Sequence, residues 1–473
     1  MFGVDGRLEP EESDASATLV VIGGGCSGIL TTVQLLINSE RASLTRRIVL
    51  VERSSHLGAG VAYGTLNKQH LLNVPAGKMS AFPERPDHFL DWVRRREPAT
   101  EQSFLPRALY ARYLHSLLAD TAASCRHCSL ELWKGEAIAA IDLTPEPAVR
   151  VELGDGRHVR AEKVVLATGN LPPANPLVND ATFYRSSRYV RDPWAPGALD
   201  GVAGSEPVLL VGTGLTAVDV VLTLLEKGHT GTIHAISRHG LLPHAHAIQP
   251  SPPRAWSPSS DTPTTRALMV EILREMREAT AQGEDWRSVV DGLRPVTQKL
   301  WQALSYDERR RFLSKLSRHW EVHRHRMPPE VGATIDTLVE AGQLIVRAAH
   351  LEAFAPAPGG VEVTLAGRMP GVSLVAHVIN CTGAQSDVTA AGNPLLDFLL
   401  VTGAARSHPL GMGLDVTDSG ALIGADGEPS KTLFALGVLR RGQLWESTAV
   451  PEIRQQAADL ARLLIESRVE VTV

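Results

Sequence analysis

Residues 18–28 read Thr-Leu-Val-Val-Ile-Gly-Gly-Gly-Cys-Ser-Gly. The first five are mostly apolar and β-branched, as in a strand that is buried in a parallel sheet. The glycines follow at once, apolar residues at helical spacing begin at Ile29, and a second apolar run ends in Glu52. In such an order the glycine turn and helix N-terminus bind a pyrophosphate, and an acid about 20 residues later accepts a ribose hydroxyl hydrogen bond. The stretch therefore predicts a dinucleotide-binding unit.

The same pattern recurs in the second half of the chain. Residues 207–211 are an apolar run, residues 212–217 read Gly-Thr-Gly-Leu-Thr-Ala, and a strand is predicted over 232–236. That strand is followed by Ser237, Arg238 and His239 instead of an acid. An arginine there suits the 2′-phosphate of NADP, which a carboxylate would repel. NADPH is therefore predicted over NADH, and the alternative is that Arg238 is an ordinary exposed loop residue.

Both halves continue alike. The first has short strand-like segments, with apolar residues at alternate or neighbouring positions, over 130–133, 136–141 and 149–152 and then a strand that ends in Ala-Thr-Gly at 167–169. The second has runs over 344–347, 351–354 and 361–364 and then a strand that ends in Cys-Thr-Gly at 381–383. Each half thus predicts a three-strand excursion and a closing strand, and two such halves imply two dinucleotide sites.

The composition fits a folded protein of several domains. The chain has 473 residues, 44% of them hydrophobic and 21% charged, and domains usually hold about 100–200 residues. A net charge of -5 predicts no nucleic-acid binding, and four cysteines are too few for a secreted disulfide framework. Residues 15–39 are uncharged, but glycines interrupt them and acidic residues precede them, which argues against a membrane span or signal peptide. We expect a cytoplasmic protein with a disordered tail at 1–16 and no membrane partner.

On these motifs nearly the whole chain resembles the two-dinucleotide-binding-domain flavoproteins, the class of glutathione reductase-like enzymes and class B flavin monooxygenases. The resemblance implies an α/β fold of two Rossmann-like (glutathione reductase-type) domains, with FAD in the first and NADPH in the second. The expected boundaries are 17–205 and 375–473 for the two parts of the FAD-binding domain and 206–374 for the NAD(P)H-binding domain. Six prolines in 241–265 predict a loop, and the helical periodicity after it predicts a helical insertion over about 241–341, either a lid or a packing insert.

A narrower resemblance rests on residues 58–64, 70–76, 237–243, 320–327 and 445–454. These stretches are similar to a bacterial FAD-NAD(P)-binding family, some relatives of which resemble amine N-oxygenases. The chain departs from the glutathione reductase type because Cys26 has no partner cysteine four or five residues on. It departs from Baeyer–Villiger enzymes because the linker over 183–194 lacks the family histidine.

Two further groups of residues invite a functional reading. Cys125 and Cys128 form a lone CxxC, for which unpaired structural thiols are favoured over a redox or metal pair. The pairs His244/His246 and His323/His325 have no cysteine or obvious carboxylate beside them, so no metal is predicted.

The site residues follow from the motifs and the resemblance. For FAD they are Gly23, Gly24, Gly25, Cys26, Ser27, Gly28, Glu52, Arg53, Ala137, Thr168, Gly169, Gly437 and Thr448. For NADPH they are Gly212, Thr213, Gly214, Leu215, Ala217, Ser237 and Arg238. The candidate catalytic residues are His70, Asn73, Arg440 and Glu446, and the N-terminus of a final helix near Pro451 is expected at the flavin.

The predicted function is that of an FAD-dependent, NADPH-using monooxygenase, in which reduced flavin forms a hydroperoxide that oxygenates a small substrate such as an amine. The expected partners are that substrate and oxygen. One alternative is an NAD(P)H-dependent reductase that passes electrons to a non-oxygen acceptor, and another is a flavin-based redox sensor. Neither the substrate nor the oligomeric state follows from the sequence.

Overall fold

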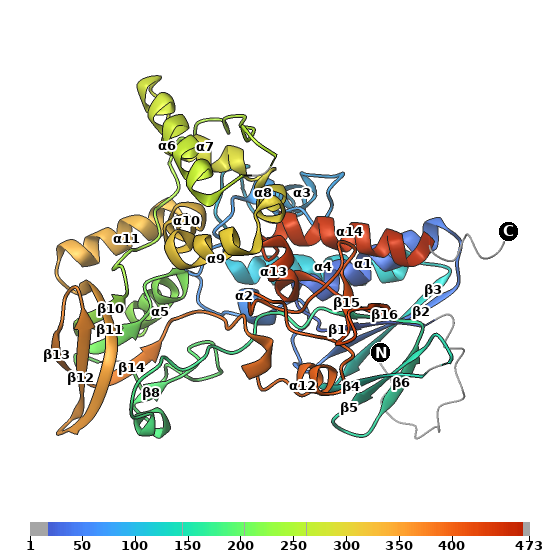
Figure 1. Ribbon diagram of the computed structural model, residues 1–473, viewed down its shortest axis with the longest axis horizontal. Coiled ribbons are helices and arrows are strands. Elements are labelled where there is room, and N and C mark those ends of the chain that lie inside the picture. The colour runs from blue at the N-terminus through green and yellow to red at the C-terminus, as the bar shows by residue number, and fades with distance from the viewer. Residues whose placement is uncertain (1–17, 144, 203, 262, 467–473) are drawn as a thin grey trace.

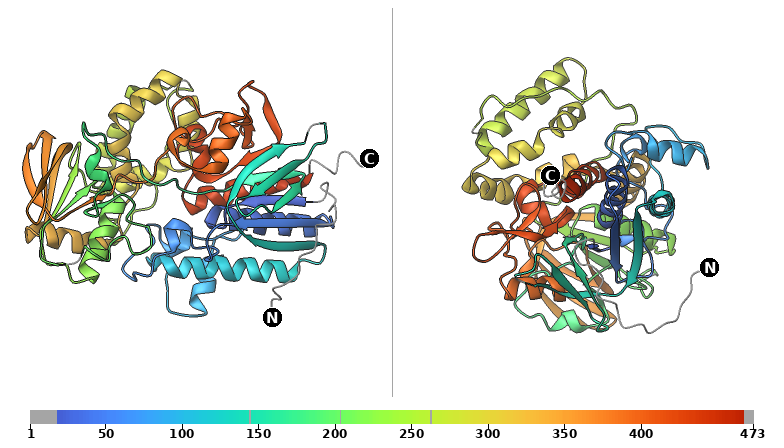
Figure 2. Two further views of the ribbon diagram at one scale, coloured as in Figure 1. Left: turned by 90° about the horizontal axis from the view of Figure 1, so that it is seen from below. Right: turned by 90° about the vertical axis from the view of Figure 1, so that its right-hand side faces the viewer.

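The computed structural model describes residues 18–143, 145–202, 204–261 and 263–466. The described strands form sheets of six, seven and three strands. Figure 2 shows the two larger sheets at opposite ends of the molecule, and we call these ends the first unit and the second unit. The predicted tail at 1–16 lies outside the described residues.

The first unit is built on the six-stranded sheet, in the order β15-β16-β7-β1-β2-β3. Neighbouring strands are parallel except β15 and β16. The bounds are β1 Thr18–Ile22, β2 Arg46–Glu52, β3 Cys128–Lys134, β7 Lys163–Leu166, β15 Ala421–Ile423 and β16 Pro429–Ala435. The quoted stretch thus supplies a central strand, and all five of its residues are buried.

Both faces of this sheet are covered. Leu19 and Val21 face a core made with helices α1 (Cys26–Arg41), α4 (Arg107–Ser124) and α14 (Val450–Glu466). Val20 and Ile22 face another core made with helix α12 (Pro394–Val401) and the small antiparallel sheet of β4 (Ala137–Asp142), β5 (Val149–Leu153) and β6 (His158–Ala161). A strand buried on both sides needs a continuous apolar run, which is what β1 has.

The second unit repeats this plan in the order β13-β12-β11-β10-β9-β14-β8. The strands from β8 to β11 are parallel, and β12 and β13 are antiparallel additions. The bounds are β8 Tyr189–Val190, β9 Val208–Val211, β10 Ile233–Ser237, β11 Leu344–Ala357, β12 Gly360–Gly367, β13 Gly371–Val375 and β14 His377–Asn380. Helices α5 (Leu215–Glu226) and α11 (Pro329–Glu340) pack on one face.

Two details differ from the sequence-based prediction. Strands β8 and β14 pair within the second sheet although they lie outside the predicted range 206–374, because a parallel strand needs a neighbour: β14 pairs with β9, and β8 pairs with β14. The excursion of the second unit is not separate, since β11 runs unbroken from the parallel sheet into it. In the first unit Gly135 separates β3 from β4, whereas no glycine or proline interrupts residues 344–355.

The predicted insertion forms a separate group of helices. Their bounds are α6 Thr265–Ala281, α7 Trp286–Leu293, α8 Thr297–Ala303, α9 Tyr306–Lys315 and α10 Ser317–Arg324, followed by α11. The described part of 241–264 forms no helix and only one isolated β-bridge, as its prolines predict. Figure 1 shows these helices above both units.

The insertion is anchored to the first unit by aromatic contacts. The Trp301 indole N–H donates to the Gly442 carbonyl over 2.8 Å, and its ring stacks on Trp445 with centroids 5.2 Å apart. Trp445 follows helix α13 (Arg441–Leu444) and has a positive φ of 60°. The shorter helices α2 (Gly60–Tyr63) and α3 (His88–Arg94) complete the first unit. None of the helices in the described ranges has the length and hydropathy of a membrane span.

Candidate active site

The two glycine loops are built in the same way. Gly23 has a φ of +109°, and a side chain there would place its first carbon 2.3 Å from the Ala167 carbonyl oxygen. Gly212 has a φ of +119°, and the same carbon would lie 2.3 Å from the Cys381 carbonyl oxygen. Only glycine fits either place, because both the backbone angle and the close approach exclude a Cβ atom. Each loop is thereby pressed against the Thr-Gly end of its closing strand.

The first loop suits a pyrophosphate and a ribose. Helix α1 starts directly after it, and no side chain caps its first turn, so its leading N–H groups point to a phosphate site. Glu52 ends β2 and accepts hydrogen bonds from the backbone N–H groups of Gly24 (2.5 Å) and Ser54 (2.7 Å). Within the described residues the buried Thr168 hydroxyl has no hydrogen-bond partner, as expected of a side chain that meets a cofactor. These residues fit FAD.

The other predicted FAD residues occupy several positions around this loop. Burial raises the pKa of Cys26 to about 12, so its thiol stays protonated at neutral pH. Ser27 lies beside Gly437, where a Cβ atom would approach its hydroxyl to 2.9 Å. Arg53 is exposed, 3.5 Å from Glu136, and Ala137 is buried at the start of β4. Roles for Cys26, Arg53 and Ala137 in holding FAD remain predictions.

The second loop borders a large cleft of about 1110 Å³. The predicted residues Gly212, Thr213, Gly214, Leu215, Ser237 and Arg238 all line it, whereas Ala217 is buried within α5. The Thr213 hydroxyl donates to the Leu241 carbonyl over 2.5 Å and lies 2.9 Å from the Ser237 hydroxyl, which ties the loop to the end of β10. Helix α5, like α1, has no side-chain cap at its N-terminus. Arg238 is exposed beside the loop and makes no ion pair with another described residue.

Residues of both units and of the insertion meet in this cleft. Asn73 comes from the first unit, Thr448 and Ala449 precede α14, and Arg294, Arg324 and Arg326 come from the insertion. The cleft therefore joins the second glycine loop to the N-terminus of the final helix, the end that the resemblance places at the flavin. That N-terminus carries partial positive charge, which favours an anion beside it.

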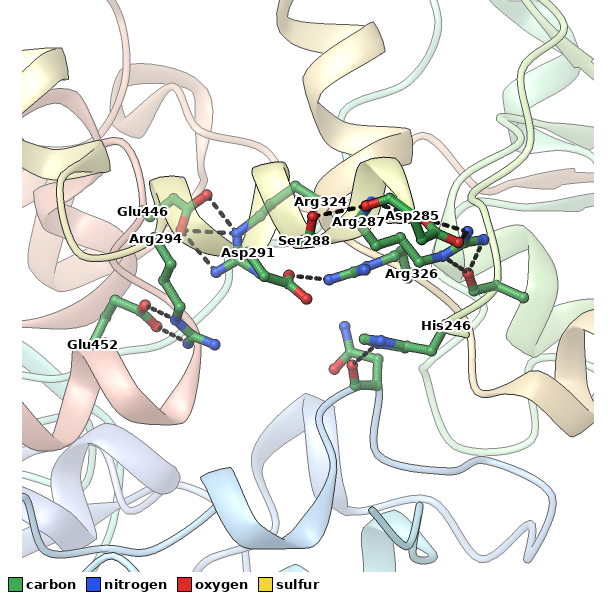
Figure 3. A network of polar contacts seen from close by, with 12 residues as sticks. His246, Asp285, Arg287, Ser288, Asp291, Arg294, Arg324, Arg326, Glu446 and Glu452 are labelled. Atoms are coloured by element: carbon green, nitrogen blue, oxygen red, sulfur yellow. Dashed lines mark hydrogen bonds and ion pairs between the residues drawn. The ribbon is translucent and has the colours of Figure 1, made fainter. Parts of the chain in front are cut away.

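Arginine–carboxylate pairs hold the insertion against the first unit, as Figure 3 shows. The Arg324 guanidinium contacts the Glu446 carboxylate at 3.0 Å through Nη2 and at 3.0 and 3.2 Å through Nε. Arg294 makes two bonds of 2.8 and 2.9 Å to Glu452 in α14.

The same network continues within the insertion and reaches the first unit again. Arg326 pairs with Asp291, and the His246 ring meets the Asn73 carbonyl at 3.0 Å. Because paired charges with several hydrogen bonds hold one geometry, these contacts define the shape of the cleft.

Two of the four candidate catalytic residues line the cleft and two do not. Asn73 and Glu446 line it. His70 does not line the cleft: it is buried, and its ring nitrogens are engaged by Thr65 at 2.8 Å and by the Asp219 carbonyl at 2.9 Å. Arg440 is also turned away from the cleft, since its guanidinium bonds Gln443 and the Asp418 carbonyl, and burial lowers its pKa to about 10.

His70 instead lies where the first unit contacts helix α5 of the second unit. Beside it the Arg107 guanidinium in α4 makes bonds of 2.7 and 3.1 Å to the Asp219 carboxylate in α5. Both side chains of this ion pair are mostly buried, with 14% and 7% exposed. The pair and His70 fix helix α5 of the second unit to the first unit.

Sequence reasoning did not place Lys78 or His325 at the cleft, and both line it. Arg441, which like its neighbour Arg440 precedes the final helix, lines it as well. Burial lowers the pKa of Lys78, and the nearby guanidinium groups of Arg294, Arg326 and Arg324 lower it further against the opposing Asp291. Burial and then Arg324 lower the pKa of His325 to about 4, so its imidazole is neutral at pH 7. For His325 the signal in the sequence was the run of basic residues at 320–327, but the pattern alone does not show which of these side chains reach the cleft.

The remaining candidates lie apart from the cleft or pack among themselves. The rings of His244 and His323 lie 4.6 Å apart, tilted by 57°, beside Trp286, and no described residues group three potential metal ligands. Cys125 and Cys128 lie near Glu40 at the far end of α1, and burial raises the pKa of Cys128 to about 12. A role for this cysteine pair is not indicated by its surroundings.

Comparison with known proteins supports the same fold and cofactors. Residues 20–171 match the family model described as FAD-NAD(P)-binding, and residues 99–247 match the model described as L-lysine 6-monooxygenase/L-ornithine 5-monooxygenase. Uncharacterized proteins of Mycobacterium tuberculosis and Mycobacterium bovis are 22% identical over 94% of this chain and 95% of theirs. The predicted resemblance to FAD- and NAD(P)-binding flavoproteins is confirmed.

Solved structures share the architecture at low identity. An ornithine hydroxylase from Pseudomonas aeruginosa aligns with a TM-score of 0.61 at 13% identity, over 95% of this chain and 99% of that one. An L-lysine 6-monooxygenase from Pseudomonas syringae gives 0.61 at 15% identity with the same coverage. A bacillithiol disulfide reductase from Staphylococcus aureus gives 0.56 at 11% identity, over 96% of this chain and 100% of that one. The predicted fold of two dinucleotide-binding domains is thereby confirmed.

Proposed function

We propose that this chain, a flavoprotein of the two-dinucleotide-binding fold, is an FAD- and NADPH-dependent monooxygenase that oxygenates the nitrogen of a small amine. The observation that carries the proposal is the single cleft of about 1110 Å³ that runs from the second glycine loop to the N-terminus of α14. A nicotinamide bound at that loop and a flavin bound at the first loop would meet there. The matched lysine/ornithine monooxygenase model supports the amine as the substrate class.

The chain's own residues bind and orient the two nucleotides. The first loop with Glu52 and Thr168 would hold FAD, and the second loop with Ser237 and Arg238 would hold NADPH. Bound FAD would accept hydride from NADPH and, once reduced, activate O2 for transfer of one oxygen atom to the substrate. The protein adds a shaped cleft, one wall of which is the helical insertion held in place by the Arg324–Glu446 pair.

The charges of the cleft favour a neutral amine as the bound form. Lys78, Arg294 and Arg326 surround one end of it, and burial, followed by these two guanidinium groups acting against Asp291, lowers the pKa of Lys78, which is itself an alkyl amine. A substrate amine in the same field would lose its proton more readily, which exposes the nitrogen lone pair for oxygenation. Arg294 and Arg326 are already paired with carboxylates, whereas Lys78 makes no ion pair with another described residue, so its amine is available to hydrogen-bond an anionic group elsewhere on the substrate.

A reductase is the second candidate, and the structural likeness to bacillithiol disulfide reductases favours it. Against it, Cys26, Cys125 and Cys128 lie outside the cleft lining, and burial raises the pKa of Cys381, the described cysteine that does line it, so its thiol stays protonated and is a poor nucleophile for disulfide exchange. A redox sensor is the third candidate, and it would not need the nicotinamide loop that lines the cleft.

The test is a product balance. The purified FAD-loaded protein is incubated with NADPH, oxygen and a panel of ω-amino acids and simple amines, and hydroxylamine product and hydrogen peroxide are both measured. The proposal expects one amine to raise NADPH consumption and to yield product in place of peroxide. Equal peroxide yield with and without every amine would overturn oxygenation, and failure of NADPH to bleach the flavin would overturn both enzyme candidates.

A further inference from the structure

Basic side chains from three separate segments gather at the end of β10. Arg238 and His239 follow this strand, Arg318 and His319 lie in the first turn of α10, and Arg368 lies in the turn between β12 and β13. The rings of His239 and His319 are 5.8 Å apart, so the insertion touches the second unit at this point. Arg238, His239 and Arg318 all line the cleft.

This gathering leaves a surplus of positive charge. Desolvation and then the charges of His319, Arg238, Arg318 and Arg368 lower the pKa of His239. Glu321 contacts Arg318 at 2.6 Å, but it also contacts Arg441 at 3.4 Å. One carboxylate shared between two arginines does not neutralise the group, which therefore keeps a net positive charge that favours an anion beside it.

The position of the group indicates which anion it takes. In a dinucleotide-binding unit the end of the second strand faces the ribose next to the adenine, where NADP carries its 2′-phosphate. Here that strand is β10, and Arg238 follows it directly. Arg318 approaches the same place from α10, although it lies 80 residues further along the chain.

We propose that two guanidinium groups bind the 2′-phosphate of NADPH: that of Arg238 in the second unit and that of Arg318 in the helical insertion. The inference rests on the proposed use of NADPH and extends it, because it makes the insertion part of the nucleotide site. Arg318 is then a specificity-determining residue for NADPH over NADH. Helix α10 also carries Arg324, which pairs with Glu446, so a nucleotide held by Arg318 would fix the helix that shapes the substrate end of the cleft.

The test uses nucleotide fragments, which separates it from catalysis. Binding of 2′,5′-ADP, 3′,5′-ADP and 5′-AMP to the FAD-loaded protein is measured by calorimetry for the native chain, Arg318→Gln and Arg238→Gln. A lost charge-assisted hydrogen bond corresponds to roughly tenfold or more in affinity. We expect both variants to weaken 2′,5′-ADP by about that factor and to leave 5′-AMP unchanged.

Controls distinguish a specific phosphate site from general attraction. Arg310→Gln changes an exposed arginine of the same insertion that contacts the Tyr306 ring, and it should alter none of the three affinities. Arg318→Lys should restore part of the affinity for 2′,5′-ADP, and the FAD content of each variant reports its folding. The inference is overturned if Arg318→Gln weakens all three ligands alike or none, or if the native chain binds 3′,5′-ADP as tightly as 2′,5′-ADP. Failure to oxygenate amines would overturn the proposed function without touching this result.

Discussion

The buried pair between Arg324 and Glu446 makes a quantitative prediction about the insertion. The exposed fractions of the two side chains are 10% and 8%, and three of their contacts lie between 3.0 and 3.2 Å. Removing one partner of such a pair leaves the other charge buried and typically costs about 3–5 kcal/mol. Since Trp320 still donates to Glu446 at 3.3 Å, we expect Arg324→Met to lower the free energy of unfolding by about 3 kcal/mol, the lower end of that range.

A double-mutant cycle isolates the pair from the packing of its side chains. Urea unfolding is followed for the native chain, Arg324→Met, Glu446→Gln and the double variant, with FAD release and circular dichroism as probes. We expect the double variant to lose less unfolding free energy than the two single variants lose together, by at least about 1 kcal/mol. Arg462→Met removes an exposed pair with Asp459 and should cost less than about 0.5 kcal/mol. Additive losses at Arg324 and Glu446 would refute the idea that this pair pins the insertion.

Three further outcomes are expected. Burial and then Arg326 lower the pKa of His246 to about 4, below its usual 6.5, so as the pH drops from 6.5 toward 4 the unfolded chain binds a proton that the folded chain does not, and the free energy of unfolding falls. The variant His246→Asn should show a smaller fall when urea unfolding is measured at several pH values. An unchanged dependence on pH would contradict this. Gly23→Ala should abolish FAD retention after gel filtration, because a Cβ atom would lie 2.3 Å from a carbonyl oxygen, while Gly156→Ala, with open space around it, should retain FAD. Arg107→Met should break the junction with Asp219 and slow flavin reduction by NADPH more than it weakens FAD binding, as measured by stopped-flow absorbance; equal effects would mean that the junction does not orient the two units.

The glycine motifs and their strands were predictable because their information is local. Gly23 and Gly212 must be glycine wherever the chain goes, and a strand buried on both faces must be apolar along its length, so composition and order reveal both. Arg238 could be assigned for a related reason, since the end of the second strand has a fixed relation to the glycine turn.

The candidate catalytic residues were less predictable because side-chain direction depends on distant contacts. Arg440 and Arg441 are neighbours in the chain, yet their side chains have different surroundings. Arg440 donates hydrogen bonds to Gln443 and to the Asp418 carbonyl, whereas Arg441 lines the cleft. His70 lies in a stretch expected at the flavin, but Asp219, far along the chain, accepts its hydrogen bond.

The sequence by itself therefore determined the two nucleotide loops, their order and the presence of a helical insertion. Only the tertiary structure decided where that insertion docks, which arginines line the cleft, and that Arg318 lines the same cleft as Arg238. The physical reason is that glycine turns and buried strands are recognised by their own backbone and burial requirements, whereas an ion pair or a shared anion site needs two segments that are neighbours in space alone.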